Sequence, residues 1–483
     1  MSQSNVVPMR GDAMREVTAA FDRLKEAWQK ERWPAAAARE DRLDRLVRLI
    51  QRERETIVEA IAEDFGSRAP VESLGADVLM TLEGARDARK SVRKWMQRRP
   101  VEPQWYARPA RTWVEPQPLG VVGIIAPWNY PVNLALGPLT AALAAGNRAL
   151  LKPSELTPKT AELLQRLVRE FFTADEVAVV TGGPEVARAI TSLPLDHLLF
   201  TGSTQVGRLV AKACAENLVP TTLELGGKSP ALMHPSYPVE TFARRLAVGK
   251  LFNAGQTCIA PDYVLLPRGL EERFERAFTA AVRAQVPDLH SKDVTSLASE
   301  KGYARMTALL DDAKAKGARL VESLPGGAPA SRRLAPVLVF EVKDEMKVMQ
   351  EELFGPILPV VAVDDVEQAI GYVNARPRPL ALYYFDDDAK RVEHVLRSTT
   401  SGGVSINDTL MHFTQENLPF GGVGHSGMGR YHGHAGFETF SHLKGVFEQS
   451  RLSVTPRVLA GPAAIARRAL EVLIGGRKRR PGE

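Results

Sequence analysis

Hydrophobic positions recur along the first part of the chain with the spacing of helices. From Asp41 onward, apolar residues return every three or four positions as far as Gly66, so an amphipathic helix that ends there is expected. A second, charged helical stretch is expected to run to about Gln97, where prolines interrupt it and the chain turns extended. The segment 111–122 is predicted to be β-structure.

After Gly120 the pattern changes to short apolar runs, each closed by glycine or proline and followed by a helical stretch. The runs are V-V-G-I-I-A-P-W, A-L-L-K-P-S-E, V-A-V-V-T-G-G and H-L-L-F-T-G-S-T. Strands that alternate with helices predict an α/β fold with a parallel, doubly wound sheet, whose C-terminal edge binds ligands. The alternation resumes after Leu225, which predicts a second α/β domain. The glycine-rich stretch 419–436 is expected to be a loop that ties the domains together.

Charge and cysteine content narrow the range of functions. The net charge of +6 comes from residues 451–483, which hold eight Arg or Lys against two Glu; the rest of the chain is neutral, so nucleic acid is not an expected partner. Two cysteines in 483 residues cannot form a disulfide framework, which favours a reducing compartment, the cytoplasm. The N-terminus lacks the apolar core of a signal peptide, and no apolar stretch is long enough to cross a bilayer.

The basic tail has an amphipathic pattern of its own. Ile465 and Leu473 lie around Arg467 and Arg468, and four basic residues follow at 477–480. A helix of this kind can contact anionic lipid at a membrane surface. A soluble tail is the preferred interpretation, and weak peripheral contact with a membrane is the alternative.

The two cysteines stand in different contexts. Cys214 lies in the plain helical pattern R-L-V-A-K-A-C-A-E-N-L, which predicts a core residue. Cys258 follows F-N-A-G-Q-T at a predicted junction between helix and loop, where a thiol can be exposed and its thiolate stabilised. Cys258 is therefore the candidate nucleophile.

Two further segments indicate chemistry. Glu224 stands between two leucines in T-T-L-E-L-G-G-K-S-P, where apolar surroundings would disfavour its charge and make it a general base near neutral pH. The alternative is a carboxylate satisfied by Lys228. In F-T-G-S-T-Q-V-G, Gly202 and Gly207 lie where a strand meets a helix, so that the backbone can approach a pyrophosphate. Glycines of an ordinary turn are the alternative interpretation.

Seven short motifs follow one another between residues 40 and 450. They are P-W-N-Y-P from Pro127, K-P-S-E from Lys152, F-T-G-S-T from Phe200, E-L-G-G-K-S-P from Glu224, G-Q-T-C from Gly255, E-E-L-F-G-P from Glu351 and P-F-G-G from Pro419. Together they resemble the signatures of the aldehyde dehydrogenase superfamily. C-I-A-P-D-Y after the thiol and G-V-G-H-S-G-M-G-R-Y-H-G resemble class 3 enzymes, and A-E-D-F-G-S-R and I-N-D-T-L-M-H resemble the coniferyl aldehyde dehydrogenase group.

The resemblance implies a Rossmann-type cofactor domain, an α/β catalytic domain and a β element for bridging and oligomerisation. The expected divisions are an NAD(P)-binding domain at 1–223 with a bridging β segment at about 101–120, a catalytic domain at 224–407, a return and bridging segment at 408–450, and a basic tail at 451–483. Class 3 relatives are commonly dimers, so a homodimer is expected. The extended segment 111–115 is the candidate for strand pairing across its interface.

The same resemblance assigns the chemistry to three residues. Cys258 attacks the carbonyl carbon of an aldehyde, and the side-chain amide of Asn129 holds the resulting oxyanion together with the backbone N–H of Cys258. Glu224 activates the water that hydrolyses the thioester to a carboxylic acid. The expected substrate is an aromatic aldehyde such as coniferyl aldehyde, or a medium- or long-chain aliphatic one. No metal is required.

The resemblance also implies which residues bind the cofactor. They are Lys152 at the adenine ribose, Gly202, Ser203 and Gly207 near the pyrophosphate, Glu352 at the nicotinamide ribose, Phe354 beside the nicotinamide ring, and Trp128. Glu155 is expected at the 2′ position of the adenine ribose, where a carboxylate accepts hydrogen bonds from a diol but repels a 2′-phosphate. NAD is therefore expected, with NADP as the alternative. Without the resemblance, Trp128 and Phe354 would be interpreted as core aromatics and Lys152 as a solvated lysine.

Three other interpretations compete with this one. His425, His432 and His434 lie in a glycine-rich loop without a supporting carboxylate or cysteine arrangement, so surface or hinge positions are expected instead of a metal site. A CoA-acylating or acyl-reducing enzyme of the same fold would gain nothing from a general base, and Glu224 argues against it. A non-catalytic protein that has kept the fold is not expected to hold both Cys258 and Glu224.

Overall fold

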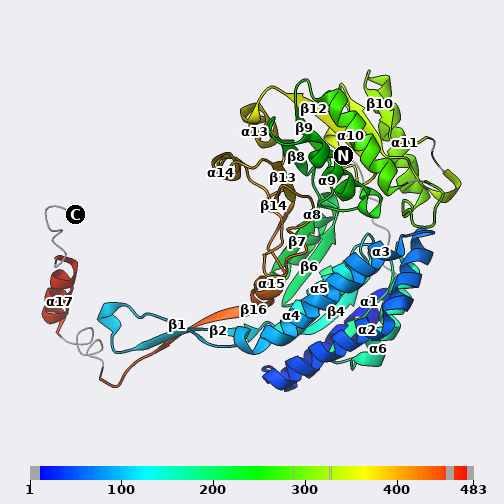
Figure 1. Cartoon of the computed structure of the whole chain (residues 1–483). Helices are drawn as coiled ribbons and strands as arrows, with labels where there is room; N and C mark the ends of the chain where they lie inside the picture. The colour runs from blue at the N-terminus through cyan, green and yellow to red at the C-terminus, as the bar shows by residue number, and fades with distance from the viewer. Residues whose placement is uncertain (1–10, 287, 326, 328, 453–461, 476–483) are drawn as a thin grey trace, which may run out of the picture.

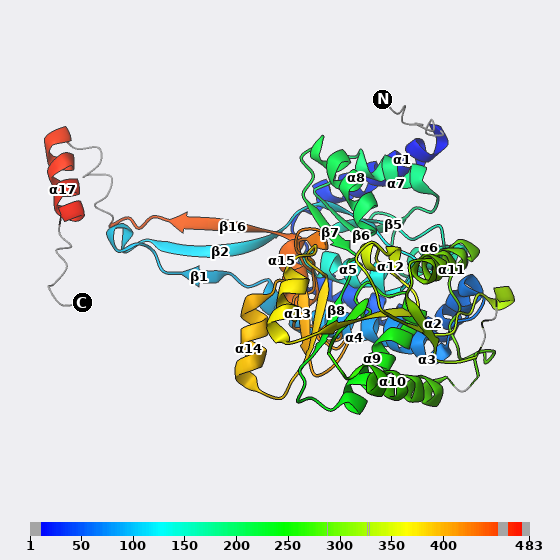
Figure 2. The ribbon, with the colours of Figure 1, turned by 90° about the horizontal axis from the view of Figure 1, so that it is seen from above.

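Three β-sheets organise the chain in the computed structural model. The described residues are 11–286, 288–325, 327, 329–452 and 462–475. Two α/β lobes lie one above the other in Figure 1, each built around one sheet, and the third sheet leaves them as a narrow arm. In Figure 2 this arm points away from both lobes.

The first sheet has six strands in the order β15-β7-β6-β3-β4-β5, and only the pair of β15 and β7 is antiparallel. Its strands are β3 (Val121–Ile125), β4 (Arg148–Lys152), β5 (Val177–Val179), β6 (His197–Gly202), β7 (Thr221–Leu225) and β15 (Gly427–Met428). Successive side chains of β3 enter different clusters, Val121 and Ile125 on one face, Val122 and Ile124 on the other. Because both faces are buried, the parallel strands are nearly continuous apolar runs.

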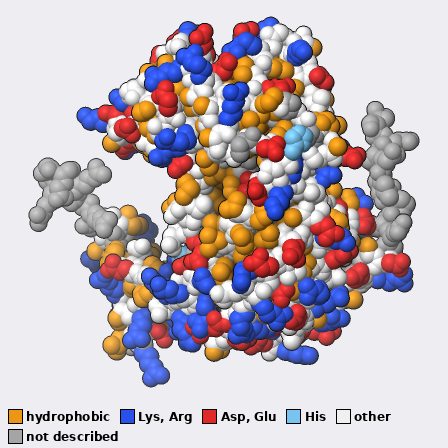
Figure 3. All heavy atoms as spheres, turned by 45° about the vertical axis from the view of Figure 1, so that its right-hand side comes forward, with side chains coloured by type: hydrophobic (Ala, Val, Ile, Leu, Met, Phe, Trp, Pro, Cys, Tyr) orange, Lys and Arg blue, Asp and Glu red, His pale blue; other side chains and the backbone are white. Residues whose placement is uncertain are grey.

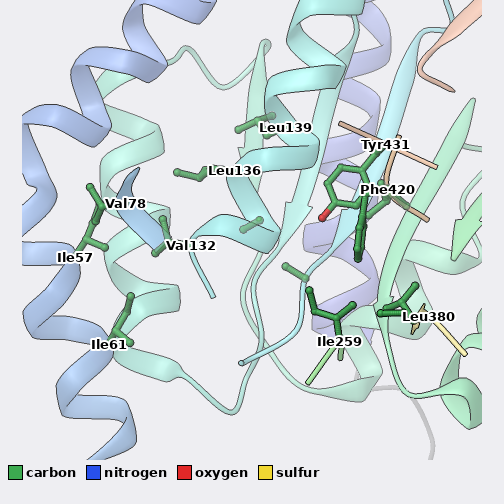
Figure 4. Packing of buried hydrophobic residues seen from close by; sticks show 14 of the residues in the cluster. Ile57, Ile61, Val78, Val132, Leu136, Leu139, Ile259, Leu380, Phe420 and Tyr431 are labelled. Atoms are coloured by element: carbon green, nitrogen blue, oxygen red, sulfur yellow. The ribbon is translucent and has the colours of Figure 1, made fainter. Parts of the chain in front are cut away.

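Helices from the N-terminal half cover this sheet. One face carries α1 (Gly11–Lys30), α7 (Pro184–Thr191) and α8 (Thr204–Ala215), and the other carries α2 (Ala36–Phe65), α4 (Met80–Trp95), α5 (Asn133–Ala145) and α6 (Pro158–Phe171). Between α2 and α4 lie the short helix α3 (Pro70–Glu72) and the π-helix η1 (Ser73–Leu79). Figure 4 shows Val78 of η1 beside Ile57 and Ile61 of α2 and near Val132, so this irregular segment is part of the core.

The second sheet has seven strands in the order β10-β11-β12-β9-β8-β13-β14, and only β10 and β11 pair antiparallel. Its strands are β8 (Pro230–Met233), β9 (Tyr263–Pro267), β10 (Arg319–Glu322), β11 (Val337–Phe340), β12 (Ile357–Val363), β13 (Ala381–Phe385) and β14 (Gly403–Ile406). Helices α9 (Val239–Leu251) and α10 (Glu271–Gln285) pack on one face, and α11 (Glu300–Ala315), α13 (Val366–Asn374) and α14 (Ala389–Ser398) on the other. The short elements are η3 (Phe252–Gly255), η4 (Pro329–Ser331) and α12 (Lys347–Gln350).

The third sheet is antiparallel and has the order β1-β2-β16. Its strands are β1 (Arg99–Val101), β2 (Arg111–Pro118) and β16 (Ser441–Glu448), with η2 (Trp105–Ala107) between the first two and α15 (Gly433–Thr439) ahead of the last. β16 pairs with β2 along its whole length, from Glu448 opposite Arg111 to Ser441 opposite Pro118. The arm therefore pairs two segments that lie more than 300 residues apart in the chain.

The predicted fold class, an α/β fold with a doubly wound, Rossmann-type parallel sheet, is confirmed. Helix α2 ends at Phe65, and Gly66 follows in the left-handed conformation (φ 74°), as the end of the apolar stripe predicts. Cys214 is fully buried on α8, which confirms its assignment to the core. Helix α1 is an addition to the prediction.

The segment 111–122 is β-structure, as predicted, and it forms parts of two strands in different sheets, because the chain turns between them at Gly120 (φ 144°). Other expectations differ in detail. The segment 419–436 is not all loop, since it contains β15 and the start of α15. β7 runs to Leu225, so the first sheet continues past the expected boundary at 223. The division into domains itself stays a prediction.

The tail is only partly described. Its helix α17 spans Ala463–Gly475, with an ion pair of 2.8 Å between Arg467 and Glu471, and the basic residues 477–480 lie outside the described part. Among the helices of the described residues, none combines the length and apolar character needed to cross a bilayer.

Candidate active site

The two lobes enclose a hollow on the face shown in Figure 3, and hydrophobic side chains gather at its floor. The loop that carries Cys258 follows α9 and η3. Asn253, Ala254 and Gly255 all have positive φ (53°, 52° and 73°), so the chain reverses sharply ahead of the thiol. A Cβ on Gly255 would lie 2.4 Å from the carbonyl oxygen of Gly355, so only glycine fits there. Sparsely populated backbone conformations cost free energy and are concentrated at functional sites.

Buried side chains hold this strained loop in place. The amide of Gln256 accepts a hydrogen bond from the backbone N–H of Ala298 (2.9 Å) and donates one to the carbonyl of Ser296 (3.1 Å). The hydroxyls of Thr257 and Tyr130 are 2.5 Å apart. The residues on the N-terminal side of the thiol are therefore anchored to two separate segments, one around Ser296 and one at Tyr130.

Glu224 is the penultimate residue of β7 and lies between Thr201 of β6 and Gly427 of β15. Its carboxylate is buried, and within the described residues neither of its oxygens has a hydrogen-bond partner. Burial raises the pKa of Glu224 well above its ordinary value. The alternative of a carboxylate satisfied by Lys228 is wrong, because the ammonium group of Lys228 pairs with Asp262. A buried, unpaired carboxyl group of this kind is suited to proton transfer near neutral pH.

Asn129 follows β3 and lies against the loop of the thiol. Its side-chain amide donates a hydrogen bond to the carbonyl of Gln256 at 3.1 Å. Its own carbonyl accepts hydrogen bonds from Arg68 (2.9 Å) and from the side chain of Asn253 (3.0 Å). The side-chain amide of Asn129 therefore contacts the backbone of Gln256, which lies two positions ahead of Cys258 in the chain.

The electrostatic surroundings of Cys258 are negative. Burial raises the pKa of its thiol to about 12, and the carboxylates of Glu352 and Glu224 act in the same direction. The backbone N–H groups of Cys258 and Ile259 oppose this rise without cancelling it. The stabilised thiolate expected from the sequence is therefore not found, because the sulfur is buried and two carboxylates lie near it.

Alkylation of Cys258 by iodoacetamide in the cofactor-free protein is expected to keep rising up to at least about pH 10, because the thiolate is the reacting form. Glu352→Gln should move this rise to lower pH, since it removes the neighbouring charge that raises the thiol pKa most. Mass spectrometry of labelled peptides across a pH series measures both effects. Cys214, fully buried, serves as the internal control and should stay unlabelled. A plateau below about pH 8 would contradict the prediction.

Lys152 and Glu155 lie at the end of β4. Lys152 is only 2% exposed, so its interpretation as a solvated lysine is wrong. Its ammonium group donates to the carboxylate of Glu155 at 2.8 Å and to the carbonyl of Pro153 at 3.1 Å. Both side chains therefore stand at the C-terminal edge of the parallel sheet, where this fold binds ligands.

The junction of β6 and α8 has the form of an anion site. Ser203 caps the helix, and its hydroxyl oxygen accepts a hydrogen bond from the N–H of Val206 at 3.4 Å. Gly202 is partly exposed just before it. Gly207 is buried, and a Cβ there would lie 2.5 Å from Leu225; its expected place near a pyrophosphate stays a prediction. Because Gly207 has no side chain, α8 can pack closely on β7.

Glu352 and Phe354 come from the loop after α12. The ring of Phe354, a residue with φ 53°, lies edge-on to Trp128 with 5.4 Å between centroids, and Trp128 also contacts Phe65. Burial raises the pKa of Glu352 to about 8, although the N–H of Gly227 donates to its carboxylate. One carboxylate oxygen of Glu352 is buried without a hydrogen-bond partner among the described residues. That oxygen is free to accept a hydrogen bond from a ligand hydroxyl.

Charged side chains that the sequence did not single out fix the Glu352 loop. Lys228 donates to the carbonyl of Glu351 at 2.8 Å, and Arg305 donates to the carbonyl of Leu353 at 2.8 Å. The carboxylate of Asp262 accepts a hydrogen bond from the N–H of Leu353, also at 2.8 Å. The signal for Asp262 was its place in C-I-A-P-D-Y, directly after the nucleophile.

The three candidate histidines differ in their surroundings. His432 is buried and packs against Phe420 and Tyr431, so of the two expected alternatives, surface or hinge, the surface position is wrong for it, and burial lowers its pKa to about 3. His434 contacts the ring of Trp95. Within the part of the chain that the structure describes, no group of three or more metal-ligating side chains comes together.

These features fit a dinucleotide. A capped helix N-terminus faces the sheet edge, a buried lysine stands beside a carboxylate, and a buried carboxylate oxygen lacks a partner. Beside them lies a cysteine faced by two carboxyl groups. Fold and site together are those of a dinucleotide-binding enzyme with a candidate cysteine nucleophile beside the cofactor site.

Comparison with known sequences identifies the family. The sequence model described as the aldehyde dehydrogenase family matches residues 2–446. A probable coniferyl aldehyde dehydrogenase of Pseudomonas aeruginosa is 49% identical over 443 residues, covering 91% of this chain and 92% of the relative. A coniferyl aldehyde dehydrogenase of a Pseudomonas species is 44% identical, covering 92% and 94%. Mouse aldehyde dehydrogenase family 3 member A2 is 39% identical, covering 87% and 86%.

Solved structures agree with the sequence comparison. Substrate-bound AldH of Staphylococcus aureus gives a TM-score of 0.90 at 36% identity, covering 95% of this chain and 99% of that chain. An aldehyde dehydrogenase of Mycobacterium tuberculosis complexed with NAD+ gives a TM-score of 0.82 at 28% identity, covering 92% of each. The chain belongs to the aldehyde dehydrogenase family. It is an NAD(P)-dependent oxidoreductase that converts aldehydes to carboxylic acids, and the resemblance of the seven motifs is confirmed.

Proposed function

We propose that this enzyme oxidises an aromatic aldehyde of the coniferyl type, with NAD as its preferred cofactor, through a thioester on Cys258. The observation that carries the proposal is the convergence of three groups from different segments. The unpaired carboxyl group of Glu224 lies close enough to raise the pKa of Cys258, and the amide of Asn129 touches the loop of the thiol.

The chemistry follows from these positions. The Cys258 thiolate attacks the carbonyl carbon, and the new oxyanion accepts hydrogen bonds from the Asn129 amide and the N–H of Cys258; one such donor contributes about 3 kcal/mol. Bound NAD(P) supplies the acceptor for the hydride that leaves the same carbon, so a thioester remains. Glu224 takes a proton from water as the water oxygen attacks the thioester, and the C–S bond breaks to release the acid and the thiolate.

Glu155 supports a preference for NAD. Its carboxylate is 39% exposed and is held by Lys152, at the end of β4 where the family motif places the adenine ribose. A carboxylate there accepts hydrogen bonds from ribose hydroxyls and repels a 2′-phosphate. The proposal is that this repulsion selects against NADP.

Glu155→Gln is expected to raise the ratio of kcat/KM with NADP to kcat/KM with NAD roughly fivefold. Two like charges about 4 Å apart in water interact by about 1 kcal/mol, and removing that repulsion gives such a factor. Steady-state kinetics with both cofactors measures the ratio. Glu162→Gln, an exposed carboxylate on α6, is the matched control and should leave the ratio unchanged. An unaltered ratio in Glu155→Gln would assign cofactor preference to other residues.

The aromatic surroundings of the thiol support an aromatic substrate. Burial raises the pKa of the Tyr383 and Tyr431 hydroxyls, and the charge of Cys258 adds to both effects, so both rings lie near the sulfur. The rings of Tyr130 and Phe252 stack at 6.4 Å beside the same loop. Flat aromatic substrates gain from such neighbours. Three relatives that are named for coniferyl aldehyde are 44–49% identical to this chain.

A kinetic screen with coniferyl aldehyde, benzaldehyde and decanal, each with NAD and NADP, tests the proposal. We expect kcat/KM for coniferyl aldehyde to exceed that for decanal at least about tenfold, which corresponds to one aromatic contact. A reversed order would assign the enzyme to aliphatic aldehydes. Strict dependence on added CoA would assign it to the acylating alternative, against which the buried Glu224 argues.

The arm supports a homodimer. It exposes Val101, Trp105, Leu443 and Phe447, apolar side chains of the kind that interfaces cover. The segment expected to pair across the interface, 111–115, belongs to β2, which already has β1 and β16 as neighbours, so that expectation is wrong. The free edges for pairing are those of β1 and β16. Light scattering after gel filtration tests the assembly.

The cellular location stays a proposal as well. Both cysteines are unpaired, as a reducing cytoplasm would keep them. Helix α17 exposes Ile465, Leu470 and Ile474, which supports either a soluble tail or weak contact with anionic lipid. Flotation with anionic vesicles separates the two.

A further inference from the structure

A buried ion pair joins Arg68, which precedes α3, to Asp77 within η1. The side chains of Arg68 and Asp77 are both 0% exposed, and the guanidinium and carboxylate are 3.1 Å apart. Asp77 lies within the π-helix η1 (Ser73–Leu79), a rare conformation that occurs frequently at functional sites. Arg68 closes the motif A-E-D-F-G-S-R, but neither that motif nor any other sequence pattern indicated a role for Arg68 or Asp77.

Arg68 reaches the residue proposed to hold the oxyanion. Its Nη1 donates to the carbonyl of Asn129 at 2.9 Å. The guanidinium lies over the rings of Phe65 and Tyr130, 4.9 Å from each centroid. A planar group held by a hydrogen bond, an ion pair and two rings has little freedom to move.

Asp77 holds the other end of the same loop. One of its carboxylate oxygens accepts hydrogen bonds from the backbone N–H groups of Val132 and Asn133, each at 3.1 Å, where α5 begins. The ion pair therefore fixes the loop 129–133 at its first and last residues. In Figure 4 Val132 lies beside Val78, the residue that follows Asp77.

Glu72 connects the same segment to the loop of the nucleophile. One carboxylate oxygen accepts a hydrogen bond from the N–H of Asn253 at 3.0 Å, and the other accepts one from the hydroxyl of Thr295 at 2.6 Å. Asn253 in turn donates to the carbonyl of Asn129. One short segment thus contacts both loops of the active site.

We propose that Arg68, Glu72 and Asp77 are positioning residues that fix the amide of Asn129 relative to the loop of Cys258. The proposal rests on the role proposed above for Asn129. Displacing a catalytic group by about 1 Å can reduce a rate about 100-fold, so the rigidity of the contacts made by these three residues bears directly on turnover.

The energetics favour positioning over stabilisation. Burial raises the pKa of Asp77, and the opposing effects of Arg68 and of the N–H groups of Asn133 and Val132 do not outweigh it. Buried ion pairs often contribute little net stability, whereas loss of one partner leaves the other charge buried alone. Both charges therefore have to be removed together in a test.

The test compares a double variant, Arg68→Met with Asp77→Asn, in the parent and in an Asn129→Ala background. In the parent, kcat/KM should fall about 10- to 100-fold, and the dissociation constant for NAD should stay within about twofold. The primary isotope effect with a 1-deuterated aldehyde should increase, because hydride transfer becomes limiting. In the Asn129→Ala background the same replacements should change kcat/KM by less than about threefold, since the group they position is gone.

Arg39→Met is the matched control. This buried arginine donates to the carbonyls of Ala144 and Ala145 at the far end of α5, so it also fixes that helix but not its active-site end. The inference fails if Arg39→Met lowers kcat/KM as much, or if the losses add fully in the Asn129→Ala background. If Asn129→Ala alone retains activity, the proposed oxyanion role fails instead. If the double variant does not fold, Arg68→Lys is compared in the parent and in the Asn129→Ala background, and the same outcomes decide.

Discussion

Cys258→Ala protein is expected to form NADH from aldehyde at less than about 10⁻⁴ of the parent rate. In the proposed mechanism the sulfur of Cys258 joins the substrate, and the second cysteine cannot replace it because Cys214 is fully buried on α8. Oxyanion donors and cofactor contacts remain, so binding of NAD should be unchanged. Initial rates of NADH formation measure the loss, and a fluorescence titration measures NAD binding.

Cys214→Ala is the control for this replacement. It removes a sulfur from the core and should lower the stability by about 1 kcal/mol while kcat stays near the parent value. If Cys258→Ala retained more than about a hundredth of the parent rate, the thioester route would be excluded.

Glu224→Gln is expected to form one NADH per active site in the first turnover and then to slow about 10²- to 10⁴-fold. The variant keeps the shape of the side chain but cannot take a proton from water, so the acyl group stays on Cys258. Rapid mixing measures the burst, and the mass of the acid-quenched protein measures the bound acyl group. Hydroxylamine, which cleaves thioesters without a base, should restore NADH formation. Loss of the burst itself would mean that Glu224 acts before hydride transfer.

The parent enzyme should show a matching pH dependence. Burial raises the pKa of Glu224, so the carboxylate form that acts as the base becomes populated only as the pH rises through that raised value. The steady-state rate is therefore expected to increase with pH through and above neutrality, and the increase should be absent in Glu224→Gln. A rate that is flat over this range would contradict a buried base.

Much of the fold could be predicted because buried parallel strands are visible in sequence. The apolar runs that became β3, β4, β5 and β6 are each closed by glycine or proline, and their helices follow directly. Glu224 and Cys258 stood out because each interrupts an otherwise simple local pattern. Local sequence patterns were therefore enough to predict the strands, the helices and the two candidate catalytic residues, Glu224 and Cys258.

What could not be predicted depends on contacts between distant segments. Arg68 and Asp77 are nine positions apart, and the role proposed for them depends on the contact of Arg68 with Asn129, about sixty residues further along the chain. Gly207 matched a phosphate motif, yet its packing against Leu225 depends on the neighbouring strand. The raised pKa of Cys258 reflects burial and two carboxylates from distant segments, Glu352 in a loop and Glu224 on β7. No local pattern contains this information.

The two-residue strand β15 has a consequence for synthesis on the ribosome. It supplies the outer neighbour of β7, the strand of Glu224, although it lies about 200 residues further along the chain. A nascent polypeptide thus carries the thiol long before the sheet beside the base can close. Premature termination upstream of Gly427 would leave a strand edge open, and such edges recruit other polypeptides. Truncated products are accordingly expected to aggregate instead of showing partial turnover.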